Sequence, residues 1–196
     1  MDRLKKQFDF ILEIDKEKQI VRQNYLADGS RKENDSEHAW HMAIMALLLH
    51  KYSTDAVDVG RVIAMLLIHD LVEIDAGDTY AYDEEGQSGK QAKEEAAAKR
   101  IFGILPEDQA EDFMDLWQEF ENGITANARF ANALDSLQPM MLNGAAGGKS
   151  WVEHGVKLSQ ILKRNDVTAQ AAPELWEFCF KEFVKPNLEA GKIVNE

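Results

Sequence analysis

The stretch LLIHDLVEID, residues 66–75, places a histidine and an aspartate side by side inside an apolar run. From Val62 to Val72 the chain reads VIAMLLIHDLV, and His69 and Asp70 are the polar residues in it. Moving a charged carboxylate out of water without a partner costs much free energy, so a buried one is normally paired, hydrogen-bonded or bound to a metal. The run therefore predicts a core element in which Asp70 has a partner that keeps it charged.

Apolar residues recur at helical spacing along nearly the whole chain, and no segment shows a convincing alternation with a period of two. We expect residues 20–35 to be irregular and 76–89, rich in Gly, Asp and Ser, to form a loop. The expected helices cover residues 4–12, a segment from an N-cap near 34–36 to 52, 57–74, 90–102, 107–120, 126–142, 151–165 and a last segment that begins near Pro173. The pattern predicts one all-α domain over residues 1–196.

Length and composition limit the class of protein. The chain has 196 residues, 45% hydrophobic and 29% charged, with a net charge of -13. Such an acidic balance argues against a nucleic-acid polymer as partner, because phosphate-backbone surfaces need clustered Lys and Arg. No run approaches the roughly 18 to 20 apolar residues of a membrane span, and the N-terminus lacks a signal-peptide core, so we expect a cytoplasmic protein without membrane contact. The single cysteine, Cys179, is interpreted as a buried small hydrophobe.

Four residues of metal-ligand type lie on three of the expected helices. They are His38, His69, Asp70 and Asp135. Two imidazoles and two carboxylates suit a divalent ion such as Mn²⁺, Co²⁺, Fe²⁺ or Mg²⁺, with positions left for water or substrate. Such an ion would also explain a charged Asp70 in an apolar run. The alternative is that each of these residues is solvated or satisfied by a neighbour.

Two further carboxylates follow the same helix. Glu73 comes four residues after His69, so on an α-helix it would share the face of His69. Asp78 follows Gly77, where a flexible backbone can turn a carboxylate back toward the ion. A carboxylate beside a metal-bound water can orient it or take its proton, which metal-assisted hydrolysis requires. The alternative for both is a solvated helix end.

The ordered set of motifs resembles a known family. S-E-H at 36–38, H-D at 69–70, Glu73, G-D-T at 77–79 and Asp135 in LDSLQP are similar to the HD-domain phosphohydrolases. Within them the sequence resembles the small 5'-nucleotidase branch, whose members remove phosphate from deoxyribonucleoside 5'-monophosphates. The resemblance covers about residues 20–143 and implies a single helical HD-domain bundle, whose C-terminal helices complete the fold.

The resemblance also implies roles for particular residues. His38, His69, Asp70 and Asp135 match the metal ligands, for one divalent ion per chain, and Glu73 and Asp78 match the catalytic carboxylates. Arg22 best matches an arginine that orients the phosphate, although Arg31 or Lys32 could take this role. A guanidinium suits it, because it grips phosphate oxygens bidentately. The implied substrate contacts are Arg22, Gln23, Asp70, Asp78, Thr79, Tyr80, Ala81 and Asp135. Gln23 stands where the family can carry an aromatic residue.

The sequence thus favours a metal-dependent phosphomonoesterase that converts nucleoside 5'-monophosphates to nucleoside and phosphate. A small-molecule nucleotide would be its partner, and a homodimer could form through exposed apolar helix faces such as that of residues 175–184. Two alternatives remain. One is a phosphodiester or pyrophosphate hydrolase of nucleotides on the same fold, although those resemble an H-D-x-x-E-D run and Ile74 follows Glu73 here. The other is a non-catalytic HD module that binds ligands or partners.

Overall fold

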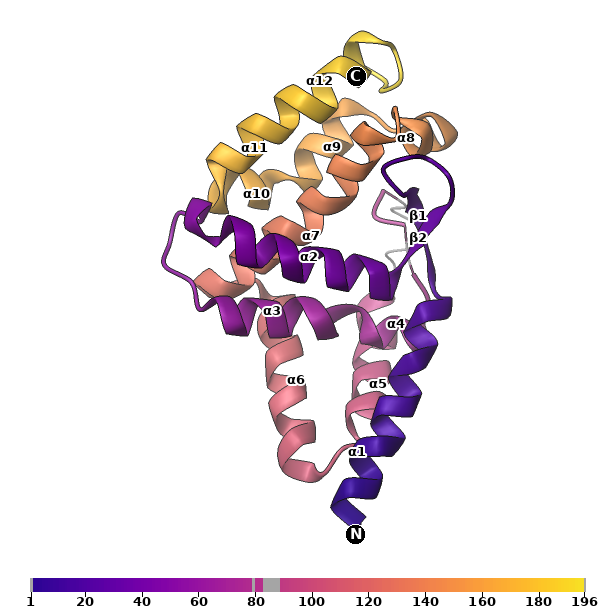
Figure 1. Cartoon of the computed structure of the whole chain (residues 1–196), viewed down its shortest axis with the longest axis vertical. Helices are drawn as coiled ribbons and strands as arrows, with labels where there is room; N and C mark the ends of the chain where they lie inside the picture. Colours follow the sequence, from indigo (N-terminus) through magenta and orange to yellow (C-terminus); the bar gives the residue numbers. More distant parts are fainter. Residues whose placement is uncertain (1, 79, 83–88, 196) are drawn as a thin grey trace.

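The computed structural model describes residues 2–78, 80–82 and 89–195. Its architecture is helical, with one small hairpin (Figure 1). The α-helices are α1 (Asp2–Glu13), α2 (Asp35–Leu49), α3 (Val59–Ile68), α4 (Glu73–Ala76), α5 (Lys90–Phe102), α6 (Glu107–Asn122), α7 (Ala126–Ala145), α8 (Lys149–His154), α9 (Leu158–Arg164), α10 (Asp166–Ala171), α11 (Pro173–Cys179) and α12 (Lys185–Glu189). The strands are β1 (Val21–Tyr25) and β2 (Lys32–Asn34). The predicted all-α class is confirmed.

The hairpin is an element that the periodicity did not predict. Strands β1 and β2 pair antiparallel within the segment expected to be irregular. Their buried side chains are polar: Arg22 and Asn24 on β1 and Glu33 on β2. An alternation of apolar and polar residues is the usual sign of a half-buried strand, so a strand that buries polar residues does not show it. The hairpin ends at Asn34, which caps α2 by accepting a hydrogen bond from the backbone N–H of Glu37.

The apolar run around residue 68 lies between two parts of the core. Val62, Met65 and Leu66 on α3 pack with α2, α7 and the C-terminal helices. Ile68 and residues 71–72 pack instead with α1, α5 and α6. In Figure 1, α2 and α3 cross the middle of the molecule, with α5 and α6 below them and the C-terminal helices above. The His69-Asp70 pair therefore lies at the junction of both apolar clusters.

The predicted helix over 57–74 is wrong in one respect. Helix α3 ends at Ile68, a 3₁₀ turn covers His69–Val72, and α4 begins at Glu73. Side chains at i and i+3 eclipse in a 3₁₀ helix. Glu73 consequently lies with Asp70 rather than with His69: one ligand atom from each of Asp35, Asp70 and Glu73 falls within 4.8 Å of the others. Tighter winding of one turn thus brings the Glu73 carboxylate beside that of Asp70.

The C-terminal layer covers one side of the same region. The predicted helix over 151–165 is divided at Gly155 into α8 and α9, whereas α11 begins at Pro173 as expected. Cys179 is buried, as predicted, and burial raises the pKa of its thiol to about 11. Among the described residues, no helix is both long enough and apolar enough to cross a membrane.

Candidate active site

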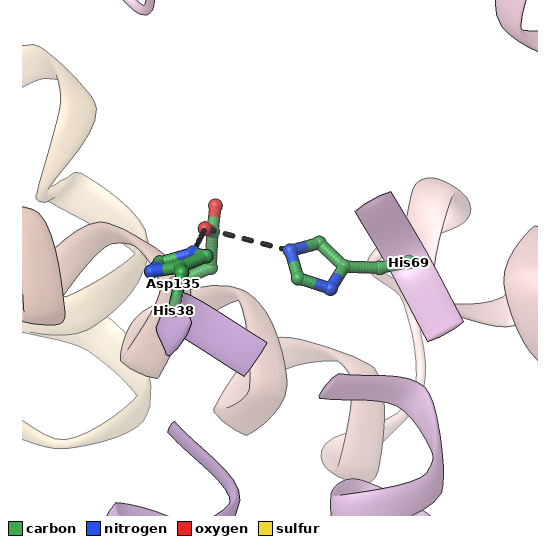
Figure 2. Close-up of side chains that lie close together, drawn as sticks. All are labelled: His38, His69 and Asp135. Carbon is green, nitrogen blue, oxygen red and sulfur yellow. Dashed lines mark hydrogen bonds and ion pairs between the residues drawn. The ribbon is translucent and has the colours of Figure 1, made fainter. Parts of the chain in front are cut away.

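Side chains from two helices and the 3₁₀ turn meet at one point. His38 comes from α2, His69 and Asp70 from the turn after α3, and Asp135 from α7; Figure 2 shows both imidazoles directed at the Asp135 carboxylate. The Nε2 atoms of His38 and His69 lie 3.1 Å and 3.7 Å from Asp135 Oδ1. Asp70 Oδ2 lies 3.9 Å and 3.1 Å from the same two nitrogens. The four residues expected to be ligands are therefore adjacent.

The orientation of the two rings leaves their Nε2 atoms turned toward this point. The Nδ1 atom of His38 lies 2.9 Å from Gln138 Oε1, and that of His69 lies 3.1 Å from the Leu66 carbonyl oxygen. Since both partners are acceptors, Nδ1 carries the proton in each ring and donates it. The Nε2 atom of His69 is buried, and no described residue gives it a hydrogen bond of acceptable geometry. Outer partners of this kind orient metal-ligating histidines, so the donor set fits a divalent ion.

The charges at this point are strongly coupled. Burial and the nearby Arg22 lower the pKa of His38 to about 4, so its ring is neutral at pH 7. Burial also opposes protonation of His69, but Asp70 and Asp135 outweigh it and raise its pKa well above the usual value. Against the effect of burial, the adjacent rings of His38 and His69 and the charge of Arg164 hold the pKa of Asp135 well below its usual value. Without a metal, one protonated imidazole thus lies between two carboxylates.

Arg22 supplies the counter-charge that the buried Asp70 requires. Its Nη1 atom lies 2.6 Å from Asp70 Oδ2 and 2.9 Å from Asp35 Oδ1. Although burial acts in the opposite direction, His69 and Arg22 hold the pKa of Asp70 well below its usual value. Arg22 therefore keeps Asp70 charged without a metal ion, which agrees with the alternative that a neighbour satisfies this carboxylate. Loss of a metal would leave Asp70 paired.

The remaining carboxylates are buried beside this ion pair. Burial, followed by the charges of Asp70 and Asp35, raises the pKa of Glu73 to about 11. Burial and Asp70 likewise raise the pKa of Asp35 to about 7, against the opposing effect of Arg22. Asp35 Oδ2 and Glu73 Oε2 have no other acceptable partner among the described residues, so a proton on Glu73 can satisfy both oxygens. Burial also raises the pKa of Asp78, which follows Gly77 at a φ of +78°.

One cavity contains most of the residues that the sequence singled out. It is lined by Arg22, Gln23, Asp70, Glu73, Asp78, Tyr80, Ala81 and Asp135, together with Asn24, Tyr82, Lys90, Ser136, Pro139, Met140, Asn143 and Arg164. Thr79 lies outside the described residues. Arg31 does not line this cavity, because it pairs with Glu37 on the surface. Lys32 donates to Gln23 and so supports the cavity wall. The geometry favours Arg22 over both alternatives.

Several residues of the site carry no signal in the sequence. Asp35, Glu33 and Gln138 are buried polar residues that hold Arg22 or His38 in place. Lys90 and Arg164 add positive charge to the cavity and pair with Glu94 and Asp135. Gln138 is a polar residue at a position where the helical period expects a buried one, and this could have indicated its role. The contacts of Arg22 with Asp35 and of Arg164 with Asp135 join residues 13 and 29 positions apart, and no local pattern reports them.

Comparison with known proteins defines the family. Residues 14–176 match the HD domain family. The crystal structure of a predicted metal-dependent phosphohydrolase from Magnetospirillum magnetotacticum MS-1 superposes with a TM-score of 0.93, at 46% sequence identity, covering 98% of this chain and 96% of that one. Because the family match covers most of the chain, this protein belongs to the HD domain family. The predicted resemblance is confirmed.

More distant relatives are named as 5'-deoxynucleotidases. The 5'-deoxynucleotidase HDDC2 of Homo sapiens is 32% identical over 111 residues, which are 57% of this chain and 53% of that protein. The Bos taurus HDDC2 is 30% identical over 125 residues, or 60% of its length. This chain thus matches little more than half the length of these curated relatives. A conserved hypothetical protein from Pyrococcus furiosus shares the fold, with a TM-score of 0.65 at 21% identity.

Proposed function

We propose that this chain is a single-domain, metal-dependent phosphohydrolase that removes phosphate from nucleoside 5'-monophosphates, with deoxyribonucleotides as the preferred class. The observation that carries the proposal is a fitting donor set of which Asp70 and Asp135 line one cavity, together with a buried guanidinium and two further carboxylates in the same cavity. The names of the relatives agree with it. One divalent ion per chain would be held by His38, His69, Asp70 and Asp135.

Each group in the cavity has a role in the proposed reaction. When bound, the ion would supply Lewis-acid stabilisation of phosphate charge. Both ion pairs of Arg22 use Nη1, so its fork retains N–H donors for the phosphate oxygens. Asp78 would orient the attacking water and accept its proton, whereas Glu73, which is protonated at pH 7, would hold Asp35 through its own proton. In-line attack on phosphorus would then release nucleoside and phosphate.

Phosphate release from a nucleotide panel tests the proposal. The protein is stripped with a chelator, single divalent metals are added back, and nucleoside 5'- and 3'-monophosphates, diphosphates and a phosphodiester are compared. We expect metal-dependent release from the 5'-monophosphates. Asp78→Asn should lower turnover about 10²- to 10⁴-fold without loss of bound metal.

Asp75→Asn is the matched control for Asp78→Asn. Asp75 lies on α4 and pairs with Arg100 on the surface, outside the cavity, so its loss should leave turnover close to wild type. Cleavage of diphosphates or phosphodiesters in preference to monophosphates would support the alternative hydrolase. A protein that binds metal and nucleotide but releases no phosphate would be a binding module.

We also propose that the chain forms a homodimer, through α2 rather than through residues 175–184. In that C-terminal segment Leu175, Cys179 and Val184 are buried in the core, and Phe178 is its large hydrophobic residue that is mostly exposed, at 60%. Helix α2 instead exposes an apolar stripe at helical spacing. Its members are Trp40, Ile44, Leu47 and Leu48, from 40% to 66% exposed. Exposed apolar stripes of this kind commonly mark interaction surfaces.

A further inference from the structure

The catalytic cavity has a polar end that the proposed reaction does not use. Asn143 lines this cavity and is only 4% exposed. Its amide oxygen Oδ1 is buried and has no hydrogen-bond partner within the described part of the chain. Buried polar atoms are nearly always hydrogen-bonded in folded proteins, and an exception at a cavity wall indicates an absent partner. A ligand that donates a hydrogen bond would supply it.

The position of Asn143 along α7 relates it to the reacting end of the cavity. Asp135, Ser136, Pro139, Met140 and Asn143 all line the cavity, at helical spacing along one face. Asn143 lies eight positions after Asp135, which corresponds to about 12 Å along a helix axis. This is comparable with the distance from the phosphate to the far edge of the base in an extended nucleotide. A phosphate beside Asp135 would therefore place its base near Asn143.

The walls between these two ends suit a flat aromatic group. Met140 offers an apolar surface on α7, and Tyr80 and Tyr82 lie on the loop that also lines the cavity. The two tyrosine rings meet edge to face with centroids 5.3 Å apart, and the ring of His154 lies 4.4 Å from that of Tyr80. Contacts with other rings hold Tyr80 in a defined orientation. A planar base could bind against such a surface.

We propose that Asn143 is the residue that recognises the nucleobase of the substrate, with Oδ1 accepting a hydrogen bond from an N–H group on the base edge. This inference rests on the proposed function, and it names the residue that would contact the base of the proposed substrate. A side-chain amide suits the role, because it pairs with base edges that present a donor beside an acceptor. Asn143 would contribute binding energy that is the same in the ground state and the transition state. Its loss should therefore raise KM more than it lowers kcat.

Steady-state kinetics of Asn143→Leu and Asn143→Ala test the inference. Leucine has a similar volume to asparagine but no polar group, whereas alanine leaves an unfilled volume. Comparing the two variants therefore distinguishes the loss of a hydrogen bond from a packing defect. We expect KM for deoxyribonucleoside 5'-monophosphates to rise about 10-fold, the size of one lost hydrogen bond. The inhibition constant of inorganic phosphate, a base-free probe of the same site, should change less than about 2-fold, with metal content unaltered.

Asn132→Leu is the matched control on the same helix. The Asn132 amide donates to the carbonyl oxygens of Phe120 and Ala128, away from the cavity, so this variant should lower thermal stability without changing the ratio of KM to the phosphate inhibition constant. An unchanged KM in both Asn143 variants, or a parallel rise in KM and in the phosphate constant, would overturn the inference alone. A wild-type protein that is inactive on every nucleotide would refute the proposed function as well.

Discussion

At the scale of single residues, one guanidinium joins two buried carboxylates beside the two histidines that are expected to be metal ligands. Arg22 contacts Asp70, an expected metal ligand, and Asp35, which is completely buried on α2. Asp35 is thus placed to fix the position of Arg22 without reaching the substrate. A buried carboxylate that keeps one arginine in place restricts where a phosphate can bind.

We predict that Asp35→Asn impairs phosphate binding by loosening Arg22. The variant keeps the shape of the side chain but removes one of the two charges that hold the guanidinium. We expect kcat/KM to fall about 10- to 100-fold, mainly through KM, while metal content stays the same. Kinetics with metal analysis measure this.

The control is Asp55→Asn, which removes an exposed carboxylate paired with Arg129 and should behave like wild type. Equal losses of metal and of activity in Asp35→Asn would show that Asp35 supports the metal ligands instead of Arg22.

At the scale of elements, the hairpin and α7 together hold His38. Gln138 on α7 accepts from His38 Nδ1 and donates to Glu33 Oε1 at 2.7 Å, and Asn24 on β1 donates to the other oxygen of Glu33. His41 also contacts this amide, at 3.2 Å, so it belongs to the surrounding layer and not to the ligand set. Pro139 follows in the same helix and cannot donate to the carbonyl oxygen of Asp135.

We predict that Gln138→Leu weakens metal binding. Without the amide oxygen, the Nδ1–H of His38 loses its acceptor and the ring is no longer held with Nε2 toward the site. We expect metal affinity to fall about 10- to 100-fold, measured by competition with a chromophoric chelator.

Gln170→Leu is the comparison, because that amide bonds Asp166 on the surface of α10. Wild-type affinity in Gln138→Leu would mean that packing alone orients the His38 ring.

At the scale of the whole molecule, a net charge of -13 coexists with an exposed apolar stripe on α2. We predict that replacing Trp40 and Leu48 with lysine converts a dimer to a monomer, because a charge in the centre of an apolar interface loses its hydration. Light scattering coupled to size-exclusion chromatography measures the mass. The matched variant is Ile124→Lys, which alters a 73% exposed apolar residue outside α2. A wild type that is monomeric at tens of micromolar would refute the dimer.

Much of the fold follows from local pattern. Helical periodicity predicted the α-helical class, and residue types suited to an N-cap located the start of α2, since caps act on backbone groups within one turn. The kinds of residue that make the site, two histidines with several carboxylates, were equally visible. These properties depend on neighbours in the chain, so the sequence by itself determined them.

The tertiary structure alone decided which of these residues meet and how they are charged. Glu33 and Gln138 are 105 positions apart, and Arg22 and Asp70 are 48 apart, so no local pattern reports either contact. The hairpin remained hidden because it buries polar residues. The 3₁₀ turn at His69 arises where two apolar clusters meet, and it sends Glu73 to the side of Asp70. Burial and long-range charge then set each pKa, because both depend on three-dimensional distance.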